Sequence, residues 1–334
     1  MKNILLVLTG GTIGSSCSDG IISSESSCCR VAQLYNEAYP ESGIYFTQVR
    51  PFTILSENLE PSYLERLVNF ISSKAAEGYD GIIVTHGSDT LSYSSAMLGL
   101  CLHGLGIPVV ITASDYVPDD PASNALYNFS AAAALACRMK SGVCTVYKNP
   151  CCKRGNVFIP TRLEQADRIN DIFSYAGSTP AAVTDEYGNI EQNTDILTEL
   201  ESCPAMPQLS QISLKKRVML LHPSPAADYD NITFSPDTAA VLHLTYHSGT
   251  IPERAAEFIS KCRKQNIPFF LCLLKRSSQA LYETSSRLMA LGAVPLYDIT
   301  EESAYAKLLL AVNLFPDNIE GFMKKQIYFE MLSQ

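Results

Sequence analysis

The sequence predicts an α/β protein made of two doubly wound domains. Short apolar segments alternate with segments of helical spacing, and strands that are apolar on both faces are typical of a mostly parallel sheet covered by helices. With 334 residues, the chain is also longer than one hydrophobic core usually organises. We therefore expect a larger N-terminal domain with helices on both faces of its sheet, and a smaller C-terminal α/β domain.

The first half of the chain supplies most of this pattern. Apolar, β-rich runs predict strands at residues 4–8, 81–85, 109–112 and 143–147. Apolar residues at helical spacing predict helices at residues 60–77, 91–105 and 124–139. Gly78 directly follows the first of these helices and is expected to end it.

A polar stretch separates the two predicted domains. Asn, Thr, Pro, Ser and Gln are frequent between residues 191 and 216, as is typical of an exposed linker. The expected domains are therefore residues 1–190 and 217–334, joined by a linker at 191–216. In the second domain we expect strands at 218–221, 240–245 and 269–274 and helices at 252–265 and 278–289.

Composition narrows the class of function. The net charge is −9 and there is no Lys/Arg-rich block, so nothing favours binding to nucleic acid or to an anionic membrane. No apolar run approaches the roughly 20 residues of a membrane span. The 11 cysteines are odd in number and no export signal is recognised, which predicts reduced thiols in a soluble, cytoplasmic protein. We expect neither a cofactor nor a metal site, since the adjacent cysteine pairs lack zinc-site spacing.

Two predicted strands end in turns that carry hydroxyl groups. Residues 9–14 read Thr-Gly-Gly-Thr-Ile-Gly, and residues 85–90 read Thr-His-Gly-Ser-Asp-Thr. The first turn lacks the glycine at Thr9 and the following helix that a dinucleotide-binding loop needs. Ligands of open α/β sheets bind outside the carboxyl ends of the strands, so we expect both turns to face one pocket.

Several of these residues also have structural interpretations. His86 stands between a strand end and Gly87, where a turn-stabilising role is at least as frequent as a catalytic one, and we assign it no catalytic role. Asp89 and Thr90 can cap the next helix, a role that is compatible with catalysis. A third segment, Ser-Glu-Asn-Leu-Glu-Pro at residues 56–61, could by itself be no more than the start of a helix.

Taken together, the three segments resemble the bacterial L-asparaginase family in their order and spacing. The resemblance is most convincing over residues 3–135, and the short start before the first motif is similar to the cytoplasmic type I branch. It implies an amidohydrolase that converts L-asparagine to L-aspartate and ammonia. It also implies a homodimer or homotetramer, in which Ser248 could reach a neighbouring site.

The resemblance implies a catalytic role for residues in the two glycine turns. Thr12 matches the nucleophile that forms an acyl-enzyme, and such a hydroxyl needs a proton acceptor within hydrogen-bond reach. Ser88 takes the place of a second family threonine and preserves its hydroxyl. Asp89 matches the carboxylate that binds the substrate's α-ammonium group and orders the hydroxyl network.

The substrate-binding residues implied by the resemblance lie in the same segments. Ser56 and Glu57 match the positions that hold the substrate's α-carboxylate and α-amino groups. Backbone N–H groups in the two glycine turns could stabilise the oxyanion, an effect often worth a few kcal/mol per donor. Gly11, Gly87 and Ser114 complete the expected binding set.

The chain departs from the family pattern at two catalytic positions. No lysine follows residues 154–156, where the family has one, and the position falls on Pro160, Glu164 or Gln165 depending on the gap. Two lysines near in sequence are possible substitutes, namely Lys148 and Lys153. The loop tyrosine of the family is also missing, because the corresponding residues 20–22 read Gly-Ile-Ile.

These departures leave two alternatives to an L-asparaginase. One is a non-catalytic or altered-specificity protein of the same fold that binds an amino acid through Ser56, Glu57 and Asp89. The other is the amidase subunit of a tRNA-dependent amidotransferase, which the same motifs resemble. For the leading hypothesis we expect a small amino-acid substrate and no nucleic-acid or membrane partner.

Overall fold

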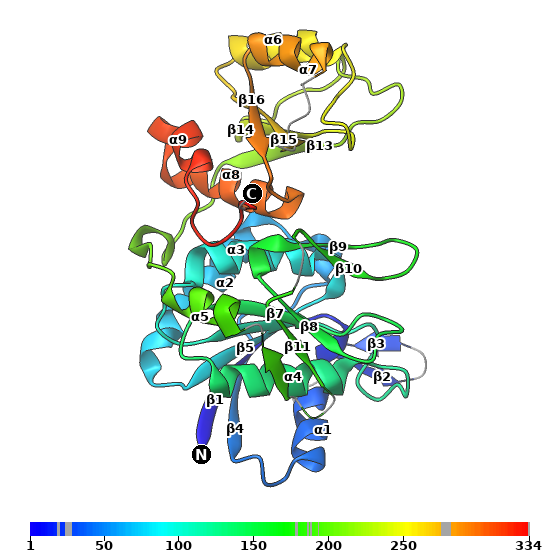
Figure 1. Ribbon diagram of the computed structural model, residues 1–334, viewed down its shortest axis with the longest axis vertical. Helices are drawn as coiled ribbons and strands as arrows, with labels where there is room; N and C mark the ends of the chain where they lie inside the picture. Colours follow the sequence, from blue (N-terminus) through cyan, green and yellow to red (C-terminus); the bar gives the residue numbers. More distant parts are fainter. Residues whose placement is uncertain are drawn as a thin grey trace. The chain divides into compact units, whose positions relative to one another are not determined.

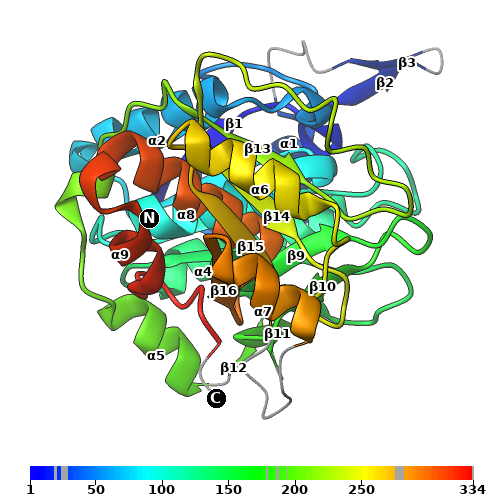
Figure 2. The same cartoon turned by 90° about the horizontal axis from the view of Figure 1, so that it is seen from above.

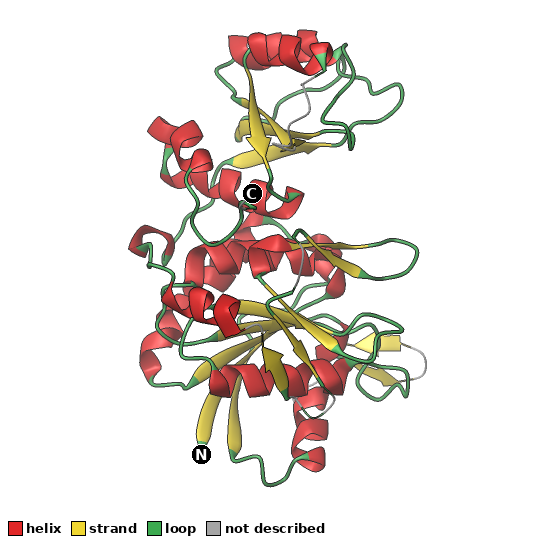
Figure 3. Cartoon of the chain, in the orientation of Figure 1, coloured by secondary structure: helices red, strands yellow, loops and turns green. Residues whose placement is uncertain are grey.

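The computed structural model describes residues 1–18, 21–23, 29–177, 180–185, 187, 189–192, 194–274 and 282–332. The chain divides into two compact units, Met1–Gln211 and Ile212–Gln334. Each unit contains its own sheet and its own helices (Figures 1 and 3). The predicted α/β fold class is confirmed. Within the described ranges, no helix is long and apolar enough to cross a membrane.

An eight-stranded, mostly parallel sheet forms the centre of the first unit. Its strand order is β12-β11-β8-β7-β6-β5-β1-β4. The parallel strands are β4 (Ile44–Val49), β1 (Lys2–Leu8), β5 (Gly81–Thr85), β6 (Val109–Thr112) and β7 (Val143–Tyr147). Antiparallel strands continue the sheet beyond β7, namely β8 (Gly155–Phe158), β11 (Ala182–Thr184) and β12 (Ile190–Gln192).

Helices cover both faces of this sheet (Figure 1). On one face lie α2 (Pro61–Lys74) and α3 (Leu91–Leu102). On the other lie α1 (Arg30–Ala38) and α4 (Ala125–Arg138). Helix α3 is buried along nearly all of its length because α2 and the sheet contact it from different sides. The expected layering of the larger domain is thus confirmed.

The strand order reverses direction next to β1. From β1 the chain first adds β4 on one side, and then crosses to add β5 on the other side. The carboxyl ends of β1 and β5 are therefore neighbours, with Leu8 in register with Thr85. In open α/β sheets, such a reversal opens the crevice in which ligands bind.

The stretch at residues 191–216, which the sequence predicts as a linker, contains regular structure. Helix α5 (Thr194–Ser202) follows β12, and its side chains of Leu197 and Leu200 are buried. A 3₁₀ turn at Pro207–Leu209 contacts α3. The first unit therefore extends to Gln211. The few apolar residues in this polar stretch are enough to anchor the stretch to the rest of the unit.

A four-stranded parallel sheet forms the centre of the second unit. Its strands, in spatial order, are β13 (Arg217–Leu221), β14 (Thr238–Leu244), β15 (Phe269–Leu274) and β16 (Ala293–Tyr297). One face carries α6 (Ala255–Lys264) and α7 (Glu283–Ala290), and the other carries α8 (Glu301–Leu314) (Figures 1 and 2). Residues 278–281, where the predicted helix 278–289 begins, lie outside the described residues.

A buried ion pair fastens the C-terminal segment to α8. The Lys307 ammonium lies 2.6 Å from a carboxylate oxygen of Glu330, and both side chains are fully buried. The Glu330 carboxylate also accepts hydrogen bonds from the backbone N–H groups of Ile327 and Tyr328, at 2.9 and 2.8 Å. Losing either partner would leave a buried charge without compensation.

We expect Glu330→Leu to lower the free energy of unfolding by about 3–5 kcal/mol, because it leaves the Lys307 ammonium buried and unpaired. The exposed pair of Lys324 and Glu320 is the matched control, and Glu320→Leu should cost less than about 1 kcal/mol. Urea denaturation followed by fluorescence and circular dichroism measures both values. Equal losses in the two variants would show that burial of the first pair is unimportant.

A buried histidine makes the second unit sensitive to acid. His243 lies in β14, where its Nε2 accepts a hydrogen bond from the hydroxyl of Tyr229 at 2.8 Å and its Nδ1 contacts the carbonyl of Leu244 at 2.6 Å. Burial lowers the pKa of His243 to about 4. The neutral imidazole is therefore favoured in the folded state, and the unfolded chain binds the proton more readily below its ordinary pKa of about 6.5.

This lowered pKa predicts a loss of stability as the pH falls from 6.5 to about 4. Above pH 6.5 the stability that the neutral His243 contributes is fully present, and about 3 kcal/mol of it is lost across this window. Replacing His243 by glutamine removes the titrating group, so the variant should lose less stability over the same window. Denaturation curves at several pH values test this, and parallel pH profiles for the two proteins would contradict it.

Candidate active site

Two of the turns predicted to carry chemistry lie side by side at the strand reversal. The 3₁₀ turn Thr12–Gly14 follows β1, and the 3₁₀ turn Ser88–Thr90 follows β5. Since β1 and β5 are adjacent and parallel, both turns leave the sheet at the same edge. The sequence predicts one pocket facing both turns. The cavity at this edge is lined by Ser88 and Asp89 of the second turn, and Thr12 is not among its lining residues.

Glycines allow the two turns to touch. A Cβ atom on Gly11, which has a φ of +78°, would lie 2.5 Å from the Cα and N atoms of Gly87. A Cβ atom on Gly87 would lie 2.4 Å from Oγ of Ser56. Distances below 3 Å are not tolerated between such atoms, so any larger residue would push the turns apart. The three predicted motifs therefore meet at Gly11, Gly87 and Ser56.

The third segment is tied to the second by hydrogen bonds. Ser56 begins a 3₁₀ turn, Ser56–Asn58, and its hydroxyl donates to a carboxylate oxygen of Asp89 at 3.1 Å. The Thr90 hydroxyl donates to the backbone carbonyl of Ser56 at 2.8 Å. Ser56 is buried, whereas Glu57 and Asp89 are exposed and so are accessible to a ligand. The buried Ser56 hydroxyl thus holds the carboxylate of Asp89, which stays exposed to solvent.

Thr12 sits in a turn that the backbone holds in shape. Its side chain is half-buried, and its carbonyl accepts a hydrogen bond from the N–H of Ser15 at 3.1 Å. The Ser15 hydroxyl donates to the carbonyl of Gly11 at 2.8 Å. The fixed backbone positions the Thr12 side chain at the same sheet edge as Ser88 and Asp89.

His86 performs a structural task beside these groups. It is buried, and its ring nitrogens contact the carbonyl of Gly87 and the hydroxyl of Ser94, each at 2.9 Å. Burial lowers the pKa of His86, so the neutral imidazole is favoured. With both nitrogens engaged, the ring stabilises the turn that presents Ser88.

Ser114 follows the next strand along the sheet. It is buried after β6, and its hydroxyl donates to the carbonyl of Tyr116 at 2.8 Å. That bond closes a short turn that also includes Asp115. Ser114 thereby shapes the loop beside the Ser88 turn.

The three positions onto which the family lysine could fall differ in their contacts. The Gln165 side chain donates to the backbone carbonyl of Asp89 at 3.2 Å. Glu164 instead accepts a hydrogen bond from the hydroxyl of Ser174 at 2.7 Å, and Pro160 is buried against Gly99. Among these three positions, Gln165 is the one whose side chain bonds to the Ser88–Asp89 turn.

The two possible substitutes for the lysine lie in other surroundings. The ammonium of Lys148 lies over the ring of Tyr127, 5.1 Å from its centroid. The hydroxyl of that tyrosine donates to the carbonyl of Thr184 in β11 at 2.7 Å. Lys153 is exposed in the connection between β7 and β8. Neither placement gives a contact with Ser88 or Asp89 among the described residues.

The position of the loop tyrosine lies in a part of the chain that is described incompletely. Gly20 is outside the described residues. Ile21 and Ile22 belong to strand β3 (Ile21–Ser23), which pairs with β2 (Ser16–Ser18).

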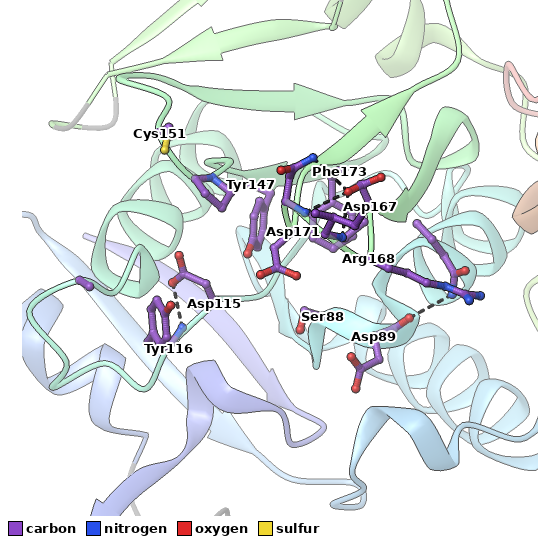
Figure 4. Close-up of a pocket in the computed structure, with 16 residues that line it drawn as sticks. Ser88, Asp89, Asp115, Tyr116, Tyr147, Cys151, Asp167, Arg168, Asp171 and Phe173 are labelled. Carbon is purple, nitrogen blue, oxygen red and sulfur yellow. Dashed lines mark hydrogen bonds between the residues drawn. The ribbon is translucent and has the colours of Figure 1, made fainter.

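A cavity of about 630 Å³ opens beside the Ser88–Asp89 turn (Figure 4). Ser88, Asp89 and Gln165 line it, together with residues that the sequence did not single out, including Asp115 and Asp171. Asp115 follows β6 directly, so the rule that drew attention to the other strand ends could have found it. Asp171 comes from the hairpin of β9 (Leu163–Ala166) and β10 (Phe173–Tyr175), which carries no such signal.

The described residues contain no cluster of three or more His, Cys, Asp or Glu side chains that could hold a metal ion. The chemical groups that do come together are hydroxyls, carboxylates and turn N–H groups. Such a set can bind an amino acid and can support attack by a hydroxyl on a carbonyl carbon.

Comparison with known proteins agrees with this arrangement. A family model described as "Asparaginase, N-terminal" matches residues 3–170. A glutamyl-tRNA(Gln) amidotransferase subunit from Aeropyrum pernix is 26% identical over 322 residues, covering 92% of this chain and 74% of the relative. The corresponding amidotransferase subunit from Methanopyrus kandleri is 27% identical over 359 residues, covering 99% of this chain and 75% of the relative.

Solved structures show the same fold. L-asparaginase I from Vibrio cholerae superimposes with a TM-score of 0.78 at 21% identity, covering 99% of each chain. The thermostable L-asparaginase from Thermococcus kodakarensis gives a TM-score of 0.77 at 21% identity, covering 99% of this chain and 100% of the other. Because the family match spans half of the sequence and the fold agrees throughout, the chain belongs to the asparaginase family of amidohydrolases.

Proposed function

We propose that the chain hydrolyses the side-chain amide of L-asparagine to L-aspartate and ammonia, through an acyl-enzyme on Thr12. The observation that carries this proposal is the meeting of the three motifs at Gly11, Gly87 and Ser56. It puts a threonine hydroxyl, a serine hydroxyl and a carboxylate at one sheet edge, as covalent catalysis on an amide requires.

In this mechanism the Thr12 hydroxyl attacks the amide carbon while the hydroxyl network at Ser88 takes up its proton. N–H groups of the two glycine turns stabilise the oxyanion. That proton passes on to the amide nitrogen, which leaves as ammonia, and water then hydrolyses the ester to regenerate Thr12. Asp89, held by the hydroxyl of Ser56 at 3.1 Å, binds the α-ammonium group of the substrate with the help of Glu57.

Release of ammonia from purified protein tests the proposal. Asparagine and glutamine are offered separately, and ammonia is followed in a coupled assay. We expect release from asparagine above release from glutamine. A folded protein that releases ammonia from neither amide would overturn the proposal. We also propose that the protein is a homodimer or homotetramer that breaks down asparagine in the cytoplasm. Sedimentation measurements on the same sample test the oligomeric state.

A second candidate is a protein of this fold that binds an amino acid with little turnover. Gln165 favours it, because an amide at this position cannot act as an ammonium or as a proton-transfer group. Calorimetry separates the two functions. Tight binding of asparagine or aspartate, combined with no ammonia release, would establish the binding function in place of hydrolysis.

A third candidate follows from the relatives that are named as subunits of a glutamyl-tRNA(Gln) amidotransferase. A chain of that kind would release ammonia from an amide for transfer to a charged tRNA. The net charge of −9 gives no support for direct contact with nucleic acid. Adding glutamylated tRNA to the ammonia assay decides the matter, since our leading proposal expects an unchanged rate and a strong stimulation would favour the transferase.

A further inference from the structure

The cavity beside Ser88 is larger than an asparagine side chain needs. Its volume of about 630 Å³ lies within the range of roughly 300–1,000 Å³ that is typical of pockets for drug-sized ligands. Ser88, Asp89 and Gln165 line one end. The cavity continues past them to Asp115, Tyr147 and the β9–β10 hairpin (Figure 4).

Carboxylates dominate the charge of this cavity. The acidic lining residues are Asp89, Asp115, Asp167 and Asp171, and Arg168 is the cationic one. Asp167 is already used inside the hairpin, where one of its carboxylate oxygens accepts hydrogen bonds from the N–H groups of Ile169 and Asn170, each at 2.9 Å. The remaining carboxylates leave the cavity with a negative potential that attracts cations.

Asp115 and Asp171 face the same buried phenol. Figure 4 shows both carboxylates directed toward the space beneath Tyr147. The pKa of Tyr147 is raised to about 12, chiefly by burial and to a smaller extent by the charges of Asp115 and Asp171. The two carboxylates come from different parts of the first unit, Asp115 from the loop after β6 and Asp171 from the β9–β10 hairpin.

The two carboxylates differ in how they are held. One oxygen of Asp115 accepts hydrogen bonds from the N–H groups of Tyr116 and Asn124, at 2.8 and 3.0 Å. Asp171 adopts a left-handed backbone with a φ of +54°, a conformation that is uncommon for a residue other than glycine. Among the described residues its carboxylate has no ion pair or hydrogen bond. Asp171 is thus presented to the cavity and is open to a ligand.

Aromatic rings complete the wall next to these carboxylates. Tyr147 and Phe173 contact each other edge to face, with ring centroids 4.7 Å apart, and both side chains are buried. Both rings line the cavity although little of their surface is exposed. Carboxylates beside aromatic rings favour a cationic group such as an alkylammonium, because both attract its charge.

The position of Ser56 indicates which part of the substrate extends into this space. Ser56 bonds to Asp89, and Ser56 and Glu57 belong to the turn that we propose for the α-amino-acid end. The cavity lies on the side of Ser88 and Gln165. In the binding mode that we propose, the side-chain amide lies between these two regions, with its nitrogen, and any substituent on that nitrogen, directed toward the cavity.

We propose that the preferred substrate is a secondary amide of an acidic amino acid, whose leaving amine carries a second, positively charged nitrogen bound by Asp115 and Asp171. This inference rests on the proposed function. Thr12 attacks the amide carbon, the C–N bond breaks, and the leaving diamine takes the proton. Water then hydrolyses the ester, so that amide plus water gives aspartate plus diamine.

Two matched synthetic amides test this subsite. β-N-(aminopropyl)-L-asparagine and β-N-butyl-L-asparagine have nearly the same shape and differ by one charge, and aspartate release measures the hydrolysis of both. The wild-type protein is expected to prefer the charged amide by about tenfold or more in kcat/KM, as one charge-assisted interaction allows. Equal values for the two amides would overturn the proposal.

Substitutions of the two carboxylates test whether they cause the preference for the charged amide. Asp171→Asn should lower the preference for the charged amide by about tenfold while leaving asparagine hydrolysis unchanged, and asparagine tolerates the positive φ at this position. Asp115→Asn keeps an oxygen for the two backbone N–H groups and should act in the same direction. Glu164→Gln is the matched control, because this neighbouring carboxylate bonds to Ser174. A loss of preference in the control as large as in Asp171→Asn would contradict the assignment.

Binding of 1,3-diaminopropane separates failure of this inference from failure of the proposed function. If no amide is hydrolysed but calorimetry detects diamine binding that Asp171→Asn weakens by about tenfold, the subsite stands and the proposed hydrolysis falls. If asparagine is hydrolysed while neither the charged amide nor the diamine is favoured, the hydrolysis stands and the subsite falls.

Discussion

Replacing Thr12 by alanine is expected to lower kcat/KM for asparagine by roughly four orders of magnitude or more. The reason is that removal of a nucleophile abolishes the covalent path, and catalytic residues that act as a unit are strongly non-additive. The side chain is half-buried in the 3₁₀ turn that follows β1, so its loss should leave the fold intact. Ammonia release measures activity, and thermal unfolding confirms that the variant is folded.

Thr12→Ser is the control for this substitution. It keeps the hydroxyl and removes one methyl group, so activity should fall far less than in Thr12→Ala. Full activity in Thr12→Ala would assign the nucleophile to another group. A loss that is equally large in both variants would show that the hydroxyl alone does not sustain activity and that the threonine methyl group is required as well.

Replacing Gln165 by lysine is expected to raise kcat for asparagine about tenfold or more. Gln165 is exposed, and its side-chain nitrogen lies 3.2 Å from the Asp89 carbonyl. A lysine amine at this position would lie near the Ser88 hydroxyl and could take part in proton transfer, which contributes about 10²–10⁴-fold where it is well placed. The pH–rate profile should gain an additional ionisation, which the wild-type amide cannot provide.

Glu164→Lys is the matched control for Gln165→Lys. It adds the same charge one residue away on β9, at a side chain that bonds to Ser174. We expect little change in kcat from this control. An increase of similar size in both variants would indicate a general effect of positive charge on substrate binding, and no increase in Gln165→Lys would exclude the assignment of position 165 to proton transfer.

The strands that the sequence predicts best are those buried on both faces. Residues 81–85, 109–112, 143–147 and 269–274 form strands with the predicted bounds, because runs of apolar residues fit the interior of a parallel sheet. Strand β4 is not predicted, since it lies at the edge of the sheet and Phe46 is the one buried residue among its six.

Some helices are not predicted from the sequence, for a different reason. Helix α1 buries Val31, Ala32 and Tyr35 among polar residues, which is too few apolar positions to define a helical period. Helix α8 is buried nearly all round, so its apolar residues show no preferred face. In both cases tertiary packing decides the structure where local spacing does not.

The candidate site, too, could be predicted from the sequence only in part. The turns at Thr12 and Ser88 follow buried parallel strands, so their common location could be predicted from strand order alone. Asp171 reaches the cavity through a hairpin that is far from these turns in sequence. The choice of Gln165 over Glu164 and Pro160 depends on which side chain points toward Asp89. Such choices depend on packing in three dimensions and leave no periodic signal in the sequence.

The most direct test of the acyl-enzyme is the partition of products between water and hydroxylamine. Asparagine and the β-methyl ester of aspartate give the same ester on Thr12, although their leaving groups differ. The account predicts the same ratio of aspartate to aspartyl hydroxamate from both substrates, and loss of both products in Thr12→Ala. A ratio that depends on the leaving group would contradict a common acyl-enzyme and with it the central role of Thr12.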